Sequence, residues 1–507
     1  MLSWVKKYKP WLLIIIGTIV WSLTMVKSGL VYKYGLGFWG ANGHDGIWHI
    51  SLIESLSRGS LEIPIFAGEV IKNYHIGFDL MLAGIHVLTR IPAVNLYFQV
   101  IPPILAVLIG VLTYKLTKSL WSVFFVYFGG NWAWILGKGE STFWSHQSIS
   151  TLINPPFALS LIILLTGLIL LQKKHYYLTG ILFGLLVEIK IYAAALAVFG
   201  LLIAGLKNKG YLKSFFVALL VATPLYLAAV PNSGKVIVFQ PGWYLETMMG
   251  FSDRLNWPRF ASAMTNYRLA GNWLKGIPAY LVALIIFFIG NLGTRLIFLR
   301  RKNDLFSQAI IFAGLAAPML FLQTGTSWNS IQFFYYSLFF SGLLAGQFLS
   351  SQKLGFVSGA LLIAATLPTT WITLKDIYLP SRPPAQIATL ELEALKFLRT
   401  QPTGIVLVPP AIPDPYAPPP RPLYLYESTS YVSAFSNHPV YFEDQGSLTI
   451  TGYPWQAREQ QVKDFLTKNI DIKAVSYLYI PNQKFDASSM GFKNIFSNSE
   501  TTIWSRQ

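Results

Sequence analysis

The chain has 507 residues, of which 53% are hydrophobic and 12% are charged, and its formal net charge is +17. Residues 375–507 hold 12 Lys and Arg and 12 Asp and Glu, so the whole positive excess lies in residues 1–374. This distribution is typical of the positive-inside rule of membrane proteins and argues against nucleic acid as a partner. The absence of cysteine excludes disulfides, thiolate metal ligands and a thiol nucleophile.

Ten apolar segments predict about 11 membrane spans, because most reach the length that crosses about 30 Å of hydrocarbon. Residues 177–206 are too long for one span and are interrupted at Glu188 and Lys190, so we expect two short spans that meet there. The basic links then fall on the inner side, with 15 Lys and Arg, Arg295 among them, and one acid. The segments lie near residues 11–28, 97–116, 119–137, 153–171, 177–206, 213–230, 279–299, 306–323, 331–349 and 354–374.

The first loop, residues 29–96, is expected outside the membrane with two helices on the membrane surface. Residues 46–58 place Trp48 and Leu52 on an apolar face, opposite serine and glutamate side chains. Residues 75–91 are at the lower limit for a span and carry a polar stripe through Asp79, His86 and Arg90. We interpret that stripe as a seam in which the aspartate and the arginine satisfy each other.

The sequence predicts three parts: a transmembrane domain at 1–375, a proline-rich linker at 376–385 and a small external α/β domain at 386–507. In the last part, residues 391–399 and 455–468 are expected to be helices, and residues 404–408 and 473–479 strands.

The candidate catalytic residues lie in the segment Gly43-His44-Asp45-Gly46-Ile47-Trp48-His49, just outside the first span. A carboxylate beside imidazoles at a membrane surface is suited to take a proton from an acceptor hydroxyl. We therefore expect Asp45 to be the general base and His44 and His49 to position the acceptor. An alternative for Asp45 is the N-cap of the following helix. His49 falls on the apolar arc of that helix, where a polar pocket shared with Asp45 would explain it.

Further candidates for substrate binding lie in the other external segments. Tyr74 and His75 begin the second surface helix, and Glu140 and His146 lie in the loop of residues 138–152. Glu140 and His146 are also of ligand type for a metal, but two ligands without a third give no specific metal site. The sequence thus predicts no certain cofactor and leaves a divalent cation as an open alternative. Solvated loop residues are the other interpretation of this pair.

Cations that suit a phosphate are Lys190 and three arginines of the loop at residues 231–278: Arg254, Arg259 and Arg268. Arginine matches phosphate in a two-pronged geometry, and tryptophans are interleaved with these arginines. The alternative is that each cation is an anchor at the membrane interface. No Walker loop, dinucleotide fingerprint, GxSxG elbow or HExxH is present, which argues against nucleotide-driven pumping and against serine or zinc hydrolysis.

With these residues in place, the chain resembles the GT-C superfamily of membrane glycosyltransferases over nearly its whole length. The shared layout is an N-terminal span, a first external loop with an acidic residue soon after it, many further spans and a C-terminal external domain. Asp45 matches the acidic position, and Tyr74-His75 stands where relatives carry a tyrosine-containing turn. The loop holds a single aspartate beside glycine and no paired acidic motif, so metal dependence stays open.

The resemblance implies an inverting transfer of a sugar from a polyprenyl phosphate to a glycan, lipid or protein acceptor. We expect this reaction at the outer face of a prokaryotic cytoplasmic membrane, with membrane lipids as further partners and no nucleic acid. Two alternatives stay open: a transporter or flippase of lipid-linked saccharides, and an inactive relative that acts as a binding protein. A transporter would use charges inside its spans, and the spans here carry little acid apart from Glu188.

Overall fold

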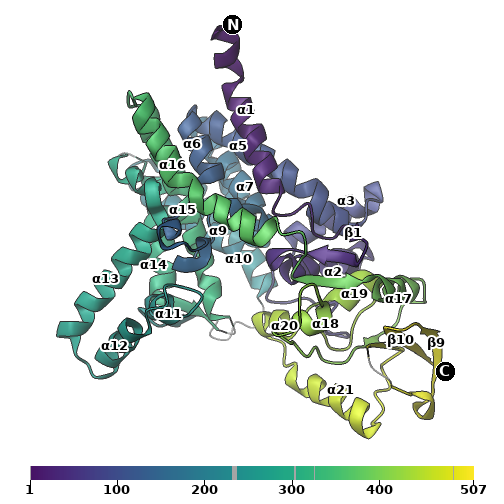
Figure 1. The fold of residues 1–507 in the computed structure, drawn as a ribbon. Coiled ribbons are helices and arrows are strands. Elements are labelled where there is room, and N and C mark those ends of the chain that lie inside the picture. The colour runs from purple at the N-terminus through teal and green to yellow at the C-terminus, as the bar shows by residue number, and fades with distance from the viewer. Residues whose placement is uncertain (1, 231–236, 302–303, 325, 483–484) are drawn as a thin grey trace. The chain divides into compact units, whose positions relative to one another are not determined.

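The computed structural model describes residues 2–230, 237–301, 304–324, 326–482 and 485–507, with the side chains of residues 2–7 left out. The chain divides into two compact units. The first comprises Met1–Thr24, Pro103–Ala228 and Ser233–Leu379, and the second comprises Met25–Pro102, Ala229–Asn232 and Pro380–Gln507. Figure 1 shows the helices and strands of both.

The first unit is a helical bundle. Its helices are α1 (Leu2–Ser22), α5 (Ile101–Thr117), α6 (Leu120–Phe128), α7 (Pro155–Gln172), α8 (Tyr176–Ile189), α9 (Ile191–Gly205), α10 (Lys209–Ala229), α11 (Trp243–Gly250), α12 (Pro258–Leu269), α13 (Trp273–Leu292), α14 (Leu305–Leu320), α15 (Gln332–Ser350) and α16 (Phe356–Thr373). Single-turn or irregular helices join them: η3 (Ala133–Leu136), η4 (Glu140–Phe143), η5 (Ser148–Ile153), η6 (Gly293–Arg300), η7 (Ser327–Ile331) and η8 (Leu374–Tyr378). One short hairpin pairs β3 (Ile237–Phe239) with β4 (Phe321–Gln323).

The helices of the bundle match the predicted apolar segments. Six helical stretches among the described residues are long and apolar enough to cross a membrane. They are Ala93–Thr117, Pro155–Gln172, Lys209–Ala229, Trp273–Arg300, Ser327–Ser350 and Phe356–Tyr378. The expected break at Lys190 is confirmed, since α8 ends at Ile189 and α9 begins at Ile191. The total of about 11 spans stays a prediction.

One predicted span is wrong in its extent. The helix expected at residues 119–137 is α6, which has only 9 residues and ends before Gly129 and Gly130. At 1.5 Å per residue it covers about 14 Å, which is too short to cross the hydrocarbon alone. The irregular turns η3, η4 and η5 follow it.

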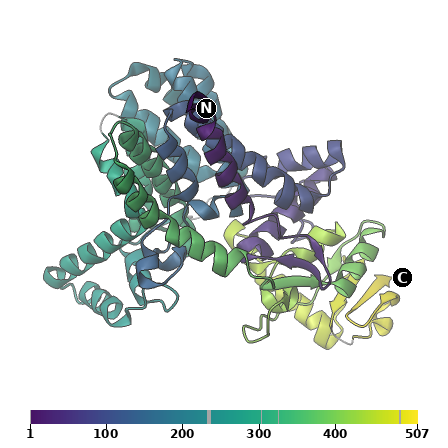
Figure 2. The same ribbon diagram turned by 45° about the horizontal axis from the view of Figure 1, so that its top comes forward.

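The second unit joins two distant parts of the chain. The part from the first loop contributes β1 (Val31–Tyr32), β2 (Gly35–Phe38), η1 (Gly40–Gly43), α2 (Asp45–Ser57), α3 (Gly77–Thr89), α4 (Ala93–Asn95) and η2 (Leu96–Val100). The C-terminal part contributes β5 (Ala385–Ala388), α17 (Thr389–Arg399), β6 (Val406–Leu407), β7 (Arg421–Pro422), α18 (Leu423–Tyr426), α19 (Tyr431–Ser436), α20 (Gln445–Thr451), α21 (Gln456–Lys468), β8 (Tyr477–Pro481), η9 (Ser488–Met490), β9 (Phe492–Ser497) and β10 (Thr501–Arg506). Figure 2 shows the same elements from a second direction.

Two four-stranded sheets hold this unit together. Their strand orders are β1-β2-β5-β7 and β6-β8-β10-β9. In the first sheet, β2 pairs antiparallel with β5, so the first loop and the C-terminal part share one sheet. They also share one apolar core, in which Trp48 and Leu52 of α2 cluster with Leu448, Phe465 and Leu478.

The structure therefore divides the chain differently from the predicted domains. The loop at residues 29–96 belongs to one compact unit with residues 380–507, and the predicted linker at residues 376–385 is ordered. The carbonyl of Pro380 accepts hydrogen bonds from Lys27 Nζ at 2.9 Å and from Trp39 Nε1 at 2.8 Å. The predicted helices at 391–399 and 455–468 are confirmed as α17 and α21, and the expected strands appear as the shorter β6 and the displaced β8.

The prediction that residues 46–58 lie on the membrane surface is wrong. Every residue of α2 from Gly46 to Leu56 is buried, including its polar side at Ser51 and Glu54. Glu54 is bound by Arg399 of α17, with 2.8 Å between Oε2 and Nη2. Helix α3 has one buried side, while Leu80 and Leu88 are exposed, and its position at the membrane surface stays a prediction.

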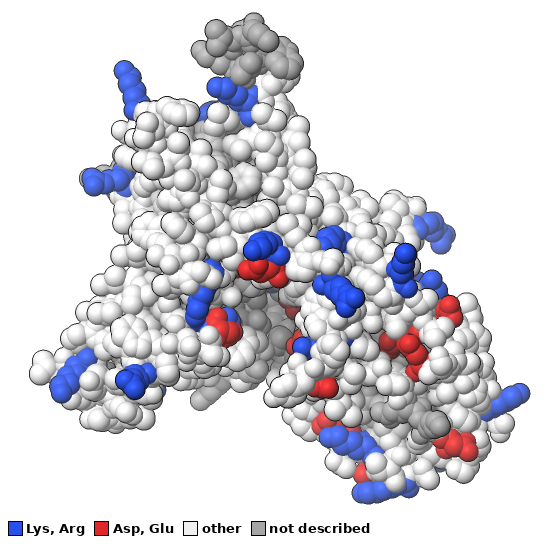
Figure 3. All heavy atoms as spheres, in the orientation of Figure 1, with Lys and Arg blue, Asp and Glu red and all other residues white. Residues whose placement is uncertain are grey.

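Surface charge follows the two units. Figure 3 shows Lys, Arg, Asp and Glu interspersed over the second unit, whereas the visible face of the helical bundle is mostly uncharged. A bundle that exposes Leu220, Leu274 and Phe356 to this extent, at 76%, 87% and 91%, requires an apolar surrounding. Both observations support a membrane location for the first unit.

Helices α6 and α15 of the bundle pack closely against each other. A Cβ atom at Gly346 would lie 2.1 Å from the backbone nitrogen of Ser122, and one at Gly342 would lie 3.2 Å from Phe125 Cβ. The hydroxyl of Ser122 donates to the Leu343 carbonyl at 2.9 Å. Small residues four apart that let two backbones touch are a common way to join helices in membranes.

We predict that Gly346→Ala destabilises the protein by about 1–3 kcal/mol, because the added methyl group meets backbone atoms that cannot turn aside. The matched control is Gly359→Ala in α16, where the nearest atom would lie at 3.7 Å, an ordinary contact. Melting temperatures in detergent should fall for Gly346→Ala and stay near wild type for Gly359→Ala. Equal melting temperatures for the two variants would contradict this packing.

Candidate functional site

Asp45 is the first residue of α2, and half of its side chain is exposed. The N-cap position belongs to His44, so the interpretation of Asp45 as an N-cap is wrong. His44 Nδ1 lies 3.0 Å from Asp45 Oδ1. A carboxylate in the first turn of a helix is also favoured by the positive end of the helix dipole. Asp45 is thus held in place while it stays accessible.

The other nitrogen of His44 faces a carboxylate from the C-terminal part of the same unit. His44 Nε2 lies 3.3 Å from Asp444 Oδ1, and the Asp444 side chain is fully buried. Asp444 is the N-cap of α20, where it accepts hydrogen bonds from the backbone nitrogen and the hydroxyl of Ser447, at 3.0 Å and 2.8 Å. The anchor of His44 is therefore fixed in its own turn.

The surroundings of the His44 imidazole favour its positively charged form. Burial by itself lowers the pKa of His44, but the charge of Asp444 and the hydrogen bonds to Asp444 and Asp45 outweigh it and raise the pKa well above 6.5. With both nitrogens protonated and directed at carboxylates, His44 has no lone pair with which to accept a proton. The group of this site that can act as a base is a carboxylate. Asp45 and Glu427 are both exposed, and of these two Asp45 is the one hydrogen-bonded to His44.

A third carboxylate, Glu427, belongs to the same group of charges. Burial raises the pKa of Glu427, and the positive charge of His44 opposes that shift while Asp45 and Asp444 add to it. Three carboxylates around one imidazolium give an excess of negative charge, which suits hydroxyl groups that donate hydrogen bonds.

His49 is paired with Asp79, and a pocket shared by His49 and Asp45 stays a prediction. Its Nδ1 lies 2.7 Å from Asp79 Oδ1, and both side chains are buried. The Tyr97 ring stacks on the His49 ring at 5.4 Å. The expected pairing of Asp79 with Arg90 is wrong, because Asp79 is buried against His49 while Arg90 is exposed at the end of α3. His49 and Asp79 tie α2 to α3.

Tyr74 and His75 lie on the other side of this pair. The two rings stack at 4.8 Å, and Tyr74 also packs edge-on against Trp48 at 5.5 Å. Both residues are half-buried. Their role in substrate binding stays a prediction.

In the first unit, Glu140 is turned into its own loop. Its side chain is buried and accepts hydrogen bonds from the Gln147 backbone at 2.8 Å and from the Ser150 hydroxyl. Burial raises the pKa of Glu140 to about 7, and these two hydrogen bonds limit the rise. This placement gives Glu140 a role in holding the loop, whereas the sequence predicted contact with substrate.

His146 and Lys190 lie beside aromatic rings of the same unit. The His146 ring is parallel to the Tyr335 ring, with 5.5 Å between their centres. Lys190 is buried between α8 and α9, with its Nζ 3.4 Å from Asn154 Oδ1 and above the Tyr192 ring at 5.7 Å. Both positions suit a polar or anionic ligand, and their roles stay predictions.

The three arginines do not form one phosphate site. Arg268 is bound by Glu246 through two hydrogen bonds, at 2.8 Å and 3.2 Å. Arg259 is exposed nine residues earlier on α12, about 13 Å away along the helix axis. The guanidinium of Arg254 lies over an aromatic face, 4.0 Å from the Trp144 ring, and 2.8 Å from Asp253.

The predicted position of Arg295 is wrong. Arg295 was expected in an inner link, but its side chain is fully buried inside the bundle. It donates hydrogen bonds to the side chain of Gln147 and, at 2.7 Å, to the Asn291 carbonyl. It therefore says nothing about which side of the membrane this segment faces.

A metal ion has no fitting site among the residues that the structure describes. No group of three His, Asp or Glu side chains there is arranged to hold one. His44, protonated on both nitrogens, offers no ligand atom, and both Asp444 oxygens accept hydrogen bonds from Ser447. The reaction step proposed below therefore uses no metal ion.

Asp444 and Glu427 are the residues of this site that the sequence did not indicate. The acidic pair Glu443-Asp444 is followed by Gln445, Gly446 and Ser447, which is a helix-cap pattern. That pattern predicts a helix start and nothing about His44, which lies 400 residues away in the chain. The pairing of β2 with β5 is what joins these two segments in one unit.

The chain is similar to known proteins in structure. No family model matches the chain, and no curated protein matches it. The fold is similar to the crystal structure of the apo form of an oligosaccharyltransferase from Archaeoglobus fulgidus, with 14% sequence identity and a TM-score of 0.49. The match covers 94% of this chain and 70% of that one. A similarity at this level does not establish a shared function.

We predict that His44 makes the stability of the protein depend on pH. Because its pKa is higher in the folded state, its stabilisation is complete below about pH 6.5 and is lost as the pH rises through the folded value. His44→Gln should lower stability by about 1.5–3 kcal/mol near pH 6, and by less near pH 9. Melting temperatures of both proteins across this range measure the difference.

The control is His175→Gln, since His175 is exposed in the first unit and should have little effect at any pH. A difference between wild type and His44→Gln that stays constant from about pH 6 to about pH 9 would show that His44 is neutral in the folded protein.

Proposed function

We propose that the chain is an inverting glycosyltransferase that moves a sugar from a polyprenyl phosphate to an acceptor hydroxyl. The observation that carries this proposal is the accessible carboxylate of Asp45 held by His44, whose other nitrogen binds the buried Asp444. A carboxylate held in place by a hydrogen bond is suited to accept a proton without turning away. The acceptor class, whether glycan, lipid or protein, stays open.

The step proposed is a single displacement. The acceptor oxygen forms a bond to the anomeric carbon, its proton passes to Asp45, and the bond from that carbon to the phosphate oxygen breaks with its electron pair on the phosphate. Because the attack and the departure occur on opposite faces of the sugar, the anomeric configuration inverts. The proton acceptor contributes typically 10²–10⁴-fold to the rate of such a step.

The leaving phosphate gains negative charge and requires a cation. Arg254 beside Trp144 and the buried Lys190 are the candidates in the first unit. A guanidinium can bind two phosphate oxygens at once, and an aromatic face beside it limits its motion. In this proposal the cations bind the donor phosphate because of their positive charge, and Asp45 accepts the proton because it is a carboxylate.

The proposed setting is the outer face of a prokaryotic cytoplasmic membrane, where the donor lipid and membrane lipids are partners. The apolar helices of the first unit support the membrane part of this proposal. The side of the membrane rests on the Lys and Arg of the inter-helix links.

For Asp45→Asn we predict near-native melting and retained donor binding, because asparagine keeps the size of the side chain and an oxygen for His44. Transfer of a labelled sugar by the purified protein should fall about 10²–10⁴-fold, since an amide cannot take the proton. The matched control is Asp464→Asn, at a partly buried aspartate paired with the exposed Lys468 on α21, which should transfer at the wild-type rate. Full transfer by Asp45→Asn would exclude Asp45 as the base.

For Arg254→Gln we predict weaker binding of the polyprenyl-phosphate donor by about 1.5–3 kcal/mol, the range for a hydrogen bond to a charged group. Arg254→Lys should restore only part of this affinity, because lysine lacks the two-pronged donor. The control is Lys275→Gln, at an exposed lysine of α13. Unchanged donor affinity in Arg254→Gln, in Lys190→Gln and in the double variant would remove these cations from donor binding.

A further inference from the structure

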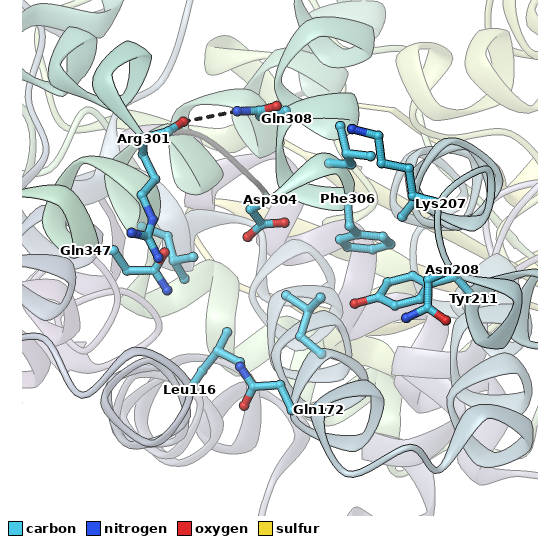
Figure 4. A pocket seen from close by; sticks show the side chains of 14 residues that line it. Leu116, Gln172, Lys207, Asn208, Tyr211, Arg301, Asp304, Phe306, Gln308 and Gln347 are labelled. Carbon is cyan, nitrogen blue, oxygen red and sulfur yellow. Dashed lines mark hydrogen bonds between the residues drawn. The ribbon is translucent and has the colours of Figure 1, made fainter.

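A second site lies in the first unit, away from every residue assigned above. It is a cavity of about 710 Å³ (Figure 4). Five parts of the bundle meet at its wall: the ends of α5, α7 and α15, the link from α9 to α10 and the link into α14. The lining residues are Leu116, Leu168, Gln172, Ala204, Lys207, Asn208, Tyr211, Arg301, Asp304, Leu305, Phe306, Gln308, Leu343 and Gln347.

The charge of this cavity favours an anion. It contains two cations, Lys207 and Arg301, and one carboxylate, Asp304. Asp304 is already engaged as the N-cap of α14, accepting from the backbone nitrogen and the hydroxyl of Ser307 at 3.0 Å and 2.8 Å. Among the residues that the structure describes, neither cation forms an ion pair. One net positive charge is thus available for a ligand.

The remaining polar groups suit hydroxyls. Figure 4 shows the amide side chains of Gln172, Asn208 and Gln347 around the same cavity as the Tyr211 hydroxyl. Gln308 donates to the carbonyl of Arg301 at 3.0 Å, which fixes that amide at the rim. Amides both donate and accept hydrogen bonds, and Asp304 can accept further ones, so free hydroxyls of a ligand find partners here.

The apolar part of the site points to a lipid. Leucine and phenylalanine side chains form the rest of the wall. Leu206, next to Lys207 in the sequence, is 74% exposed, and Leu299, two residues before Arg301, is 55% exposed. Exposed leucines next to Lys and Arg at the end of a membrane bundle are expected where acyl chains lie alongside and charged groups reach the headgroups.

We propose that this cavity binds the headgroup of an anionic phospholipid that carries free hydroxyls. Lys207 and Arg301 bind its phosphate, and the amides and Asp304 bind its hydroxyls. The acyl chains pass along Leu206 and Leu299. This proposal is independent of the proposed function, because none of its residues takes part in the transfer step.

The test uses purified full-length protein and native mass spectrometry with phosphatidylglycerol as the probe, which carries a phosphate and two free hydroxyls. Phosphatidylcholine with the same acyl chains is the comparison, and glycerol 3-phosphate is the soluble form of the headgroup. We expect phosphatidylglycerol to stay bound while phosphatidylcholine and glycerol 3-phosphate are lost. Lys207→Gln and Arg301→Gln should each weaken phosphatidylglycerol binding about fivefold, since one cation near a membrane contributes about 1 kcal/mol.

The matched control is Lys353→Gln, at an exposed lysine after α15 that does not line the cavity. It should bind phosphatidylglycerol as wild type does, and the melting temperatures of all three variants should equal that of wild type. Equal binding of both phospholipids, or an equal loss in Lys353→Gln, would overturn the proposal. Glycerol 3-phosphate binding that depends on Lys207 and Arg301 would also overturn it, in favour of a soluble phosphate ligand.

Discussion

The candidate catalytic site depends on the apolar core that the first loop shares with the C-terminal part of the chain. Trp48 and Leu52 of α2 belong to one cluster with Leu448 of α20, so α2 and α20 are packed in the same core. The first residue of α2 is Asp45, and the N-cap of α20 is Asp444. The distance between His44 and Asp444 is therefore set by packing of helices and not by the histidine itself.

The sheet that joins the two parts contains a position that only glycine fills well. Gly35 of β2 has a φ of +120°, and a Cβ atom there would lie 2.0 Å from the carbonyl oxygen of Ile387 in β5. A side chain would force β2 away from its partner. Since β2 leads into η1 and then α2, this close approach also fixes where the segment that carries His44 and Asp45 begins.

Most of the buried carboxylates in the second unit connect structural elements and are not accessible to a substrate. His49 with Asp79 and Glu54 with Arg399 connect elements inside the second unit, and in each pair at least one side chain is almost fully buried. Glu443 does the same through the backbone of α19, accepting from Val432 and Ser433 at 2.7 Å and 3.2 Å. Burial raises the pKa of Glu443 to about 8, with those hydrogen bonds limiting the rise. Asp45 differs from all of these carboxylates in being half exposed, which is why the reaction is assigned to it.

The long helices could be predicted from the sequence, because apolar length is a local property. The turn at Lys190 was also readable, since a charged residue interrupts an apolar run. The early end of α6 was not, because aromatic and aliphatic residues continue the apolar pattern past Gly129 and Gly130. The position of helix α2 was wrongly predicted for a related reason. Its polar face suggested contact with water or lipid headgroups, but Glu54 on that face binds Arg399, which lies 345 residues further along the chain.

The candidate site was predictable only in part, because some of its contacts join residues that are far apart in the sequence. Asp45 and His44 stand together in the sequence, but Asp444 reaches them through the shared core, and no local pattern indicates that contact. The three arginines looked equivalent in the sequence, yet Glu246 pairs with Arg268 and Asp253 pairs with Arg254, whose guanidinium also lies over the Trp144 ring. Counting charges along a loop does not reveal which of them is already paired.

The most direct test of the central claim is the anomeric configuration of the product. Purified protein in liposomes would be given a polyprenyl-phosphate sugar labelled with ¹³C at the anomeric carbon, together with candidate acceptors, and the product would be examined by NMR. A base-assisted single displacement predicts complete inversion at that carbon. Retention of configuration would contradict the account, because it requires two displacements and a covalent intermediate, for which Asp45 as a base has no place.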